Sequence, residues 1–353
     1  MKKILHLFRA EKFTEGFINL MTDFSEERHE FWVYGENYLD DNCHYLKLEN
    51  VKYYPRIDIK INKKSTEGEL QRYDLIFYHG VFEDFLIEYF YTHKTLLKKL
   101  ILYFWGGDKE ALPYNWRERK RKKYVVENSA AVVTLIPQDY LDLKEQYHIR
   151  GKNFCARYND IKIFDMITEI SNMPKTAQGV INIQVGNSAT TTNNHLEVLS
   201  LLSKFKDENI RIYIPLSYGE QSYAEEVIRY GKDVFGDKCI PIQQYMSFEE
   251  YYKLNHKMHI GIFNMKRQQA MGNINALMQF GCKIYLKKDF LLWDFFAKDL
   301  GCAVGEIGEI SNMDFKKFIE FPEKDKLYNK MQCRESFSCE ESMKEWKAIF
   351  DSI

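Results

Sequence analysis

The stretch INIQVGNSATTTNNHLEVLSLLSKF, residues 181–205, contains the change of pattern that decides the fold. An apolar strand-like run ends before Gly186, a loop of small hydroxyl and amide residues follows, and an apolar-periodic helix begins near His195. This order is typical of a βα unit in a parallel sheet. The small loop and the free N–H groups at the helix start suit a bound diphosphate. An ordinary βα loop capped by asparagine is the alternative interpretation.

The same alternation runs through most of the chain. Short apolar runs alternate with longer amphipathic runs, such as 83–100 and 115–129, which predicts α/β architecture with parallel sheets covered by helices on both faces. We expect strands at 3–8, 30–35, 74–80, 100–106, 130–136 and 152–158 in the first half, and at 180–186, 210–216, 238–243, 258–264 and 282–288 in the second.

The alternation breaks over residues 159–179, and a domain boundary is expected near 174–179. The sequence predicts two doubly wound, Rossmann-like domains, residues 1–175 and 176–338. We expect the last helix, within 339–353, to cross back to the first domain. Two such domains would face each other across a cleft lined by the carboxyl ends of their strands, where open α/β sheets bind ligands.

Composition excludes several classes of protein. The chain has 353 residues, 45% of them hydrophobic, but no apolar run of about 18 residues that could span a bilayer. Charged residues interrupt the apolar start, so we interpret it as a first strand and not as a signal peptide. The seven cysteines form no CxxC pair, which favours reduced thiols in the cytoplasm. His and Cys show no metal-ligand spacing, and we expect neither a metal nor a cofactor.

Two further loops after expected strands have chemistry suited to the same ligand. The loop after 258–264 carries Lys266 and Arg267, and Gly272-Asn273 then opens a helix. Cations beside a helix N-terminus suit a leaving diphosphate, on which charge grows in the transition state. A solvated loop is the alternative. The loop after 210–216 carries Ser217-Tyr218-Gly219 and could form a wall of the same pocket.

The set VGNSAT..NNH, IPLSYG, FNMKRQQAMGN, FYHGVF and FWGGDKE resembles the 4-acetamido-4,6-dideoxy-galactose (Fuc4NAc) transferases of glycosyltransferase family 56, which act in enterobacterial common antigen synthesis. The similarity covers nearly the whole chain. It implies a GT-B fold and inverting, metal-independent transfer from a dTDP-sugar, with a UDP-sugar as the other possible donor. The implied acceptor is an undecaprenyl-diphosphate-linked glycan, which places the enzyme on the cytoplasmic face of the inner membrane.

The resemblance assigns roles to individual residues. In the second half, the residues that fall on the family's donor-binding loops are Gly186, Asn187, Ser188, Asn193, Pro215, Tyr218, Gly219, Arg267, Gln268, Gln269 and Gly272, beside Asn273. In the first half, the matches to the family's HG.F and WG.D motifs are His79, Gly80, Trp105, Gly106 and Asp108. The opening HLFRAEKF is less rich in histidine than the family's, and residues 36–70 match poorly, so the acceptor glycan can differ.

Inverting transfer needs a base that takes the proton of the acceptor hydroxyl. Asp108 and His79 both lie at ends of expected strands in the first half. We favour Asp108, because partial desolvation beside Trp105 would raise the pKa of its carboxyl group. His79 would then position the acceptor, and His6 is a third candidate. A core histidine and a helix N-cap are the alternative roles of His79 and Asp108. The chain has no DxD motif, which agrees with a diphosphate held by protein donors.

A basic stretch, NWRERKRKKY at 115–124, suits the anionic lipids of the inner leaflet. Its candidate membrane residues are Trp116, Arg117, Arg119, Lys120, Arg121, Lys122 and Lys123. Nucleic acid would attract the same charges, but no nucleic-acid motif accompanies them and the net charge of the chain is -1, so we expect no nucleic-acid partner. A solvated helix face is the remaining alternative.

Three classes of function remain open on the sequence. The first is a GT-B glycosyltransferase. The second is another enzyme on the same scaffold, such as a nucleotide-sugar 2-epimerase, which would need several acids and a histidine in the cleft. The third is a non-catalytic protein that binds a nucleotide-sugar or a polyanion.

Overall fold

The computed structural model describes residues 1–35, 43–110, 115–175 and 179–353. The chain forms two compact units: unit 1 is Met1–Lys162 with Ser338–Ile353, and unit 2 is Ile163–Phe337. The first passage between the units falls inside helix α8 (Ile161–Ser171). Residues 176–178, beside the expected boundary, and residues 36–42, within the segment of poor family similarity, lie outside the described part.

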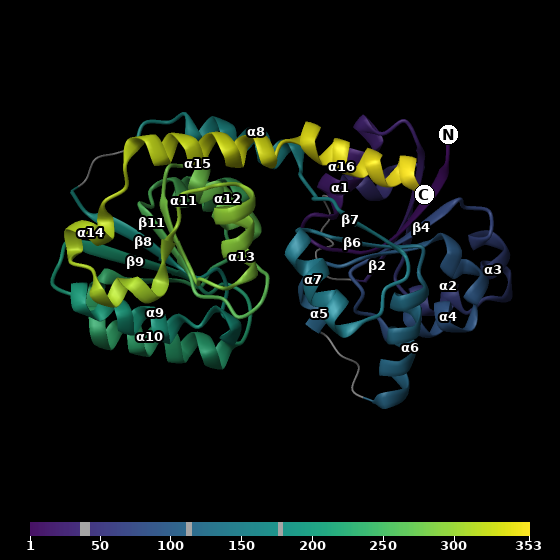
Figure 1. Cartoon of the computed structure of the whole chain (residues 1–353), viewed down its shortest axis with the longest axis horizontal. Coiled ribbons are helices and arrows are strands. Elements are labelled where there is room, and N and C mark those ends of the chain that lie inside the picture. Colours follow the sequence, from purple (N-terminus) through teal and green to yellow (C-terminus); the bar gives the residue numbers. More distant parts are fainter. Residues whose placement is uncertain (36–42, 111–114, 176–178) are drawn as a thin grey trace. The chain divides into compact units, whose positions relative to one another are not determined.

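Unit 1 is built on a seven-stranded parallel sheet of order β3-β2-β1-β4-β5-β6-β7 (Figure 1). Its strands are β1 (Lys3–Arg9), β2 (Arg28–Tyr34), β3 (Val51–Tyr54), β4 (Leu75–His79), β5 (Leu100–Tyr103), β6 (Ala131–Thr134) and β7 (Lys152–Cys155). Its helices are α1 (Thr14–Phe24), α2 (Ile57–Ile61), α3 (Lys64–Leu70), α4 (Asp84–Thr92), α5 (Gly107–Glu110), α6 (Trp116–Asn128), α7 (Pro137–Gln146) and α16 (Cys339–Ser352).

Both faces of this sheet are buried, which explains its nearly continuous apolar strands. Alternate residues point to opposite faces: Leu5 packs with α4 and α6 on one face, whereas Phe8 packs with α1 and α16 on the other. The sheet is therefore the middle layer of a three-layer unit.

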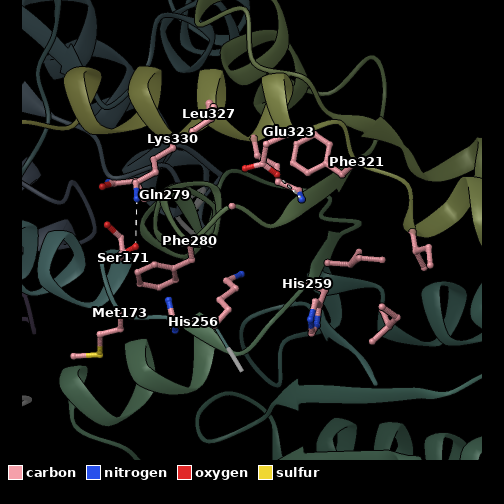
Figure 2. Close-up of a pocket in the computed structure, with 16 residues that line it drawn as sticks. Ser171, Met173, His256, His259, Gln279, Phe280, Phe321, Glu323, Leu327 and Lys330 are labelled. Atoms are coloured by element: carbon pink, nitrogen blue, oxygen red, sulfur yellow. Dashed lines mark hydrogen bonds and ion pairs between the residues drawn. The ribbon is translucent and has the colours of Figure 1, made fainter. Parts of the chain in front are cut away.

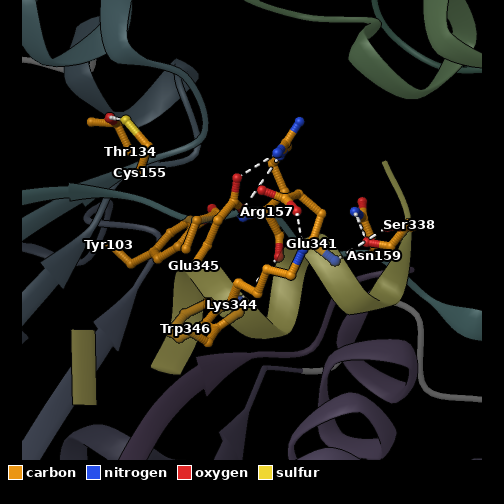
Figure 3. Close-up of polar contacts among 11 residues, drawn as sticks. Tyr103, Thr134, Cys155, Arg157, Asn159, Ser338, Glu341, Lys344, Glu345 and Trp346 are labelled. Atoms are coloured by element: carbon orange, nitrogen blue, oxygen red, sulfur yellow. Dashed lines mark hydrogen bonds and ion pairs between the residues drawn. The ribbon is translucent and has the colours of Figure 1, made fainter. Parts of the chain in front are cut away.

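Helix α16 completes unit 1 although it is the last segment of the chain. Trp346 is fully buried, and its ring is stacked on Tyr103 at 5.6 Å while its indole N–H donates to the backbone oxygen of Arg157 (3.0 Å; Figure 3). The Arg157 guanidinium forms an ion pair with Glu345 of α16, and Asn159 donates to the backbone oxygen of Ser338 (3.2 Å).

Unit 2 repeats the plan with a six-stranded parallel sheet of order β10-β9-β8-β11-β12-β13. Its strands are β8 (Ile181–Val185), β9 (Ile210–Pro215), β10 (Cys239–Ile242), β11 (Ile260–Phe263), β12 (Lys283–Leu286) and β13 (Gly305–Glu306). Besides α8, its helices are α9 (His195–Leu202), α10 (Gln221–Phe235), α11 (Phe248–His256), α12 (Met271–Gln279), α13 (Leu291–Trp293), α14 (Phe315–Ile319) and α15 (Glu323–Ser336).

The eleven expected strands are confirmed to within a few residues at each end. Two strands were missed, β3 and β13, and both are short edge strands. Within the described ranges, no helix has the length and apolar character needed to cross a bilayer.

Candidate functional site

The order of the strands places two loops of unit 2 side by side. The sheet is wound outward in opposite directions from the neighbouring strands β8 and β11, and such a switch point is where open α/β sheets bind ligands. The loop after β8 begins at Gly186, whose N–H donates to the backbone oxygen of Ile262 in β11 (3.0 Å). The loop after β11 begins at Asn264, at the same edge of the sheet.

Gly186 is required by the turn at the end of β8. Its φ is +65°, in the left-handed region that side chains disfavour. A Cβ atom at this position would lie 2.4 Å from Nε2 of His195, the buried first residue of α9. Gln184 supports the turn by donating to the backbone oxygen of Gly186 (3.2 Å).

Asn193 holds the β8 loop in its curved form. Its side-chain oxygen accepts from the N–H of Asn187 (3.1 Å), and its amide nitrogen donates to the backbone and side-chain oxygens of Ser188 (3.0 Å each) and to the hydroxyl of Thr190 (2.8 Å). The side chain is 1% exposed. Asn193 therefore shapes the loop from within, whereas we had expected it among the donor-binding residues.

The loop after β9 is joined to the β8 loop by backbone hydrogen bonds. The N–H of Ala189 donates to the oxygen of Tyr218, and the N–H of Glu220 donates to the oxygen of Ala189 (2.7 Å each). Gly219 lies between them with φ +117°, and a Cβ there would meet the Ala189 carbonyl at 2.5 Å. The side chain of Asn187 also donates to the Tyr218 hydroxyl (3.0 Å).

The loop after β11 is joined to the β8 loop in the same way. The N–H of Lys266 donates to the backbone oxygen of Thr192 (2.9 Å), and the Thr192 hydroxyl donates to the side-chain oxygen of Gln269 (3.1 Å). Ala270 then adopts φ +60° and turns the chain into α12. The structure thus brings residues 186–188 and 267–272 to one edge of one sheet.

Arg267 gives this edge a positive charge. Arg267 is half-buried, and in the part of the chain that the structure describes its guanidinium forms no ion pair or hydrogen bond. It is close to Tyr218: burial raises the pKa of the Tyr218 hydroxyl, and the charge of Arg267 opposes that rise. The first N–H groups of α12 add partial positive charge beside it.

Four buried polar atoms at the same edge have no protein partner among the described residues. They are Oδ1 of Asn187, Nε2 of His195, Nδ2 of Asn264 and Nε2 of Gln269. Buried polar atoms are rarely left without a hydrogen bond, so a cluster of them beside a cation indicates a polar ligand. Neither His195 nor Asn264 was expected among the donor-binding residues. The signal was their position: His195 begins the helix after the β8 loop, and Asn264 follows a buried strand as Gly186 does.

Three other expected donor residues have different surroundings. Pro215 is the last residue of β9 and pairs with Ile242, so it lies in the sheet one residue before the loop. Gln268 is 3% exposed and forms part of the loop's interior. Gly272 is exposed at the start of α12, and a Cβ there would meet nothing within 4 Å.

In unit 1, Asp108 joins the loops that follow β4 and β5. It is 0% exposed, and its carboxylate accepts from the N–H of Val81 (2.7 Å) and of Trp105 (2.8 Å). Burial raises the pKa of Asp108 to about 6, against these hydrogen bonds and the charge of Lys122. The direction of this shift agrees with our expectation. However, both carboxylate oxygens accept hydrogen bonds inside the protein and the side chain is fully buried, so an acceptor hydroxyl does not reach them in this geometry.

His79 and His6 belong to a buried chain of hydrogen bonds. His79 Nε2 pairs with His6 Nδ1 (2.8 Å), His6 Nε2 pairs with His29 Nδ1 (2.8 Å), and His79 Nδ1 pairs with the Tyr158 hydroxyl. Burial lowers the pKa of His6 and of His79 well below the ordinary value. Both ring nitrogens of His79 and both ring nitrogens of His6 form hydrogen bonds, whichever tautomer each ring adopts. We therefore correct the expectation that His79 or His6 contacts an acceptor: both are core histidines.

The indole ring of Trp105 packs directly against Gly80. Gly80 has φ +70°, and a Cβ on it would lie 2.6 Å from the indole ring of Trp105. The indole N–H donates to the Tyr158 hydroxyl (3.1 Å), and Phe13 packs edge-on against the same ring at 4.9 Å. Trp105 is half-buried.

Glu11 is an accessible carboxylate that our sequence reasoning missed. It follows β1, at the switch point between β1 and β4, and the loop that carries it packs on Trp105 through Phe13. Glu11 is half-buried, and burial raises the pKa of its carboxyl group, against the charges of Arg9 and Lys12. In the described ranges its carboxylate has no hydrogen bond or ion pair. The signal in the sequence was its place directly after the first strand.

The basic helix α6 has fewer surface cations than expected. Trp116 is 62% exposed, with the Lys120 ammonium 4.7 Å from its ring centre. The other exposed cations are Arg117, Arg119 and Lys123. Arg121 forms an ion pair with Glu88 (2.7 Å).

Lys122 is a correction. It is 2% exposed and donates to the backbone oxygens of Asp108 (2.9 Å) and Val81 (3.1 Å). Helical spacing places it on the inner face with Val125 and Val126, so it does not face a membrane.

Comparisons with known proteins agree with this architecture. A family model described as 4-alpha-L-fucosyltransferase, glycosyl transferase group 56, matches residues 12–306. A glycosyltransferase from Rickettsia africae is 14% identical with a TM-score of 0.71, covering 99% of this chain and 98% of that one. Anabaena HepE, solved with UDP and glucose, is 10% identical with a TM-score of 0.70 over 100% of both chains. An alpha,alpha-trehalose-phosphate synthase (UDP-forming) from Burkholderia vietnamiensis is 8% identical, with a TM-score of 0.68 over 100% of both.

These comparisons confirm two expectations. The family match confirms the resemblance and selects glycosyltransferase among the three classes of function. The structural similarity shows the fold, which is GT-B, with two Rossmann-like parallel-sheet units.

We expect Gly186→Ala to lower the free energy of unfolding by about 2–4 kcal/mol, because the residue would be strained at positive φ and would also displace His195. Denaturant unfolding measures the loss. Gly179→Ala is the matched control, with φ +64° but nothing within 4 Å of the added Cβ, and should cost only about 1–2 kcal/mol. Equal losses in the two variants would contradict the close packing of the loop on His195.

Proposed function

The chain belongs to the 4-alpha-L-fucosyltransferase family, glycosyltransferase group 56, and on that premise we propose its donor, acceptor and chemistry. The donor is a dTDP-linked acetamido-dideoxy-hexose of the Fuc4NAc type, and the acceptor is a polyprenyl-diphosphate-linked glycan. Transfer proceeds with inversion and without a metal ion. The observation that carries the proposal is Arg267, which forms no ion pair or hydrogen bond in the described residues. It lies on the loop after β11 at the switch point of unit 2, and this loop and the loop after β9 are both hydrogen-bonded to the loop after β8.

Unit 2 is proposed to hold the nucleotide. When the glycosidic bond breaks, negative charge grows on the departing diphosphate, and donors fixed in advance lower the barrier most. Arg267 supplies a full positive charge, and the N–H groups that open α12 supply partial charge. The hydrogen bonds from Ala189 and Lys266 support this role because they hold the loops in place before the ligand arrives.

Unit 1 is proposed to bind the acceptor and supply the base. The base removes the hydroxyl proton as the acceptor oxygen attacks the anomeric carbon from the face opposite the diphosphate. Asp108, our first candidate, has a suitably raised pKa, but its two oxygens are occupied. Glu11 has a raised pKa and a carboxylate without a partner in the described ranges, beside the loop packed on Trp105. We therefore propose Glu11 as the base and Asp108 as the residue that joins the β4 and β5 loops.

Arg267→Gln should weaken dTDP binding by about tenfold or more, because hydrogen bonds to charged groups contribute about 1.5–3 kcal/mol. Turnover should fall by about 100-fold, with the KM for the acceptor unchanged. Thermal unfolding with dTDP measures binding: at 100 times Kd the nucleotide should stabilise the wild type by about 2.7 kcal/mol. Arg229→Gln, an exposed arginine of α10, is the control. The role of Arg267 would be contradicted if neither variant lost dTDP affinity or turnover. It would also be contradicted if Arg267→Gln lost acceptor affinity as much as dTDP affinity.

Glu11→Gln should abolish transfer while dTDP binding and thermal stability are kept. Because a base must be deprotonated, kcat/KM of the wild type should fall as pH drops through the pKa of Glu11, which burial raises above its ordinary 4.5. Glu15→Gln on α1 is the matched control and should leave the profile unchanged. Asp108→Asn should chiefly lower stability. Full activity of Glu11→Gln, with loss of activity in a stable Asp108→Asn protein, would return the base role to Asp108.

The exposed part of α6 is proposed to bind anionic lipid headgroups at the cytoplasmic face of the membrane. Trp116 with Arg117, Arg119 and Lys120 supports this, because aromatic rings beside cations anchor at interfaces. Lys120→Gln should weaken binding to phosphatidylglycerol vesicles by about fivefold, from about 1 kcal/mol per basic residue. Lys232→Gln, exposed on α10, should have no effect in the same sedimentation assay. If both variants and the wild type bind the vesicles equally, the α6 surface is excluded as the lipid-binding surface.

A further inference from the structure

A cavity of unit 2 lies at the opposite end of the strands from the candidate donor loops. Its volume is about 390 Å³ (Figure 2). It is lined by Ile181 and Ile260, the first residues of β8 and β11, whereas the loops described above follow the last residues of these strands. The remaining walls come from the end of α8 and the segment after it, the end of α11 and the turn before β11, the end of α12, residues 319–321 and helix α15.

Positive charge gathers around this cavity. Lys175, Lys326 and Lys330 line it, and the one carboxylate among the lining residues, Glu323, is held by Lys326 (3.1 Å). Two positive charges are therefore left without a partner on the lining. Burial is the main cause that lowers the pKa of Lys330, and the positive charges of Arg334 and Lys175 lower it further. Such repulsion costs free energy in the folded protein, and a bound anion would offset it.

The hydrogen-bond donors are held in position by the protein. Lys175 Nζ donates to the backbone oxygen of Met258 (2.9 Å), and Lys330 Nζ donates to that of Ser171 (3.3 Å; Figure 2). An ammonium has three N–H groups, so each lysine keeps donors for a ligand. His259 Nδ1 accepts from the N–H of Asn182 (3.0 Å), which leaves the proton of the neutral ring on Nε2 as a further donor. Burial, followed by the charges of Lys175 and Lys326, lowers the pKa of His259 and favours this neutral form.

Apolar side chains form the rest of the cavity. Phe280, Phe321 and Leu327 lie on the lining, and Phe280 packs edge-on against His256 at 5.4 Å. The volume is far larger than an inorganic ion needs and falls in the usual range for small-molecule pockets. The ligand that matches this lining has a dianionic end and an apolar body.

We propose that this cavity binds a phosphate monoester of a small apolar or aromatic group, separately from the nucleotide. The phosphate dianion matches the two unpaired positive charges, and the N–H groups that Lys175 and Lys330 keep can donate to its terminal oxygens. The ester group packs against Phe280 and Phe321. Because α15 and the segment after α8 form walls, the ligand also ties these segments to the sheet.

Isothermal titration of the full chain with phenyl phosphate tests the proposal. Lys330→Met keeps the aliphatic stem and removes the charge, and it should weaken binding by about tenfold. Lys324→Met is the matched control, because Lys324 is exposed on the same helix and does not line the cavity. Inorganic phosphate should bind more weakly than phenyl phosphate, and phenol should not bind. The affinity for dTDP should be unchanged in Lys330→Met.

Three results would overturn the site: equal affinities of Lys330→Met and Lys324→Met, full competition between dTDP and phenyl phosphate, or no binding of phenyl phosphate to the wild type.

Vesicles with phosphatidic acid distinguish the sources of the phosphate. If they displace phenyl phosphate from the wild type, the same chemistry is presented by a lipid headgroup. If they do not, the ligand is a soluble ester. Failure of the nucleotide experiments on Arg267 would leave this result standing, since neither Arg267 nor the donor loops line this cavity.

Discussion

The structure depends on one constraint, the reversal of strand order next to the first strand of each parallel sheet. Parallel strands send all their following loops to one edge, and the reversal opens a space between two of those loops. In unit 1 the reversal lies between β1 and β4, and in unit 2 between β8 and β11. Every residue for which we propose direct contact with the reacting groups follows one of these strands or the strand next to it.

The two switch points are constructed differently. In unit 2, hydrogen bonds of the backbone join three loops, and a guanidinium and several buried polar atoms are left for a ligand. In unit 1, polar groups satisfy one another: His29, His6 and His79 form a chain of hydrogen bonds that ends on Tyr158, and Asp108 joins two loops. A preorganised cationic site stabilises a departing diphosphate, whereas a satisfied network gives a rigid wall. The carboxylate of Glu11, half-buried on the loop that packs on Trp105 through Phe13, has no such partner among the described residues.

Much of the fold could be predicted from sequence because its signals are local. Apolar runs marked eleven strands, and the glycine or asparagine that ends two of these runs marked the loops at 186–194 and 264–272. Short edge strands such as β13, with two residues, give too weak a pattern. The chemistry of unit 1 was predicted less well, because burial and pairing depend on distant residues. Sequence places His79 at a strand end, but only the fold brings His6 and Tyr158 to its two nitrogens. Lys122 appears in a run of cations, and its backbone partners are 14 and 41 residues away.

The most direct test of the account is a crystal structure of the protein soaked with dTDP. We predict that the diphosphate lies against the Arg267 guanidinium and the N–H groups that open α12, with the β8 loop beside it. A nucleotide bound in unit 1, or in the cavity lined by Lys175 and Lys330, would contradict it.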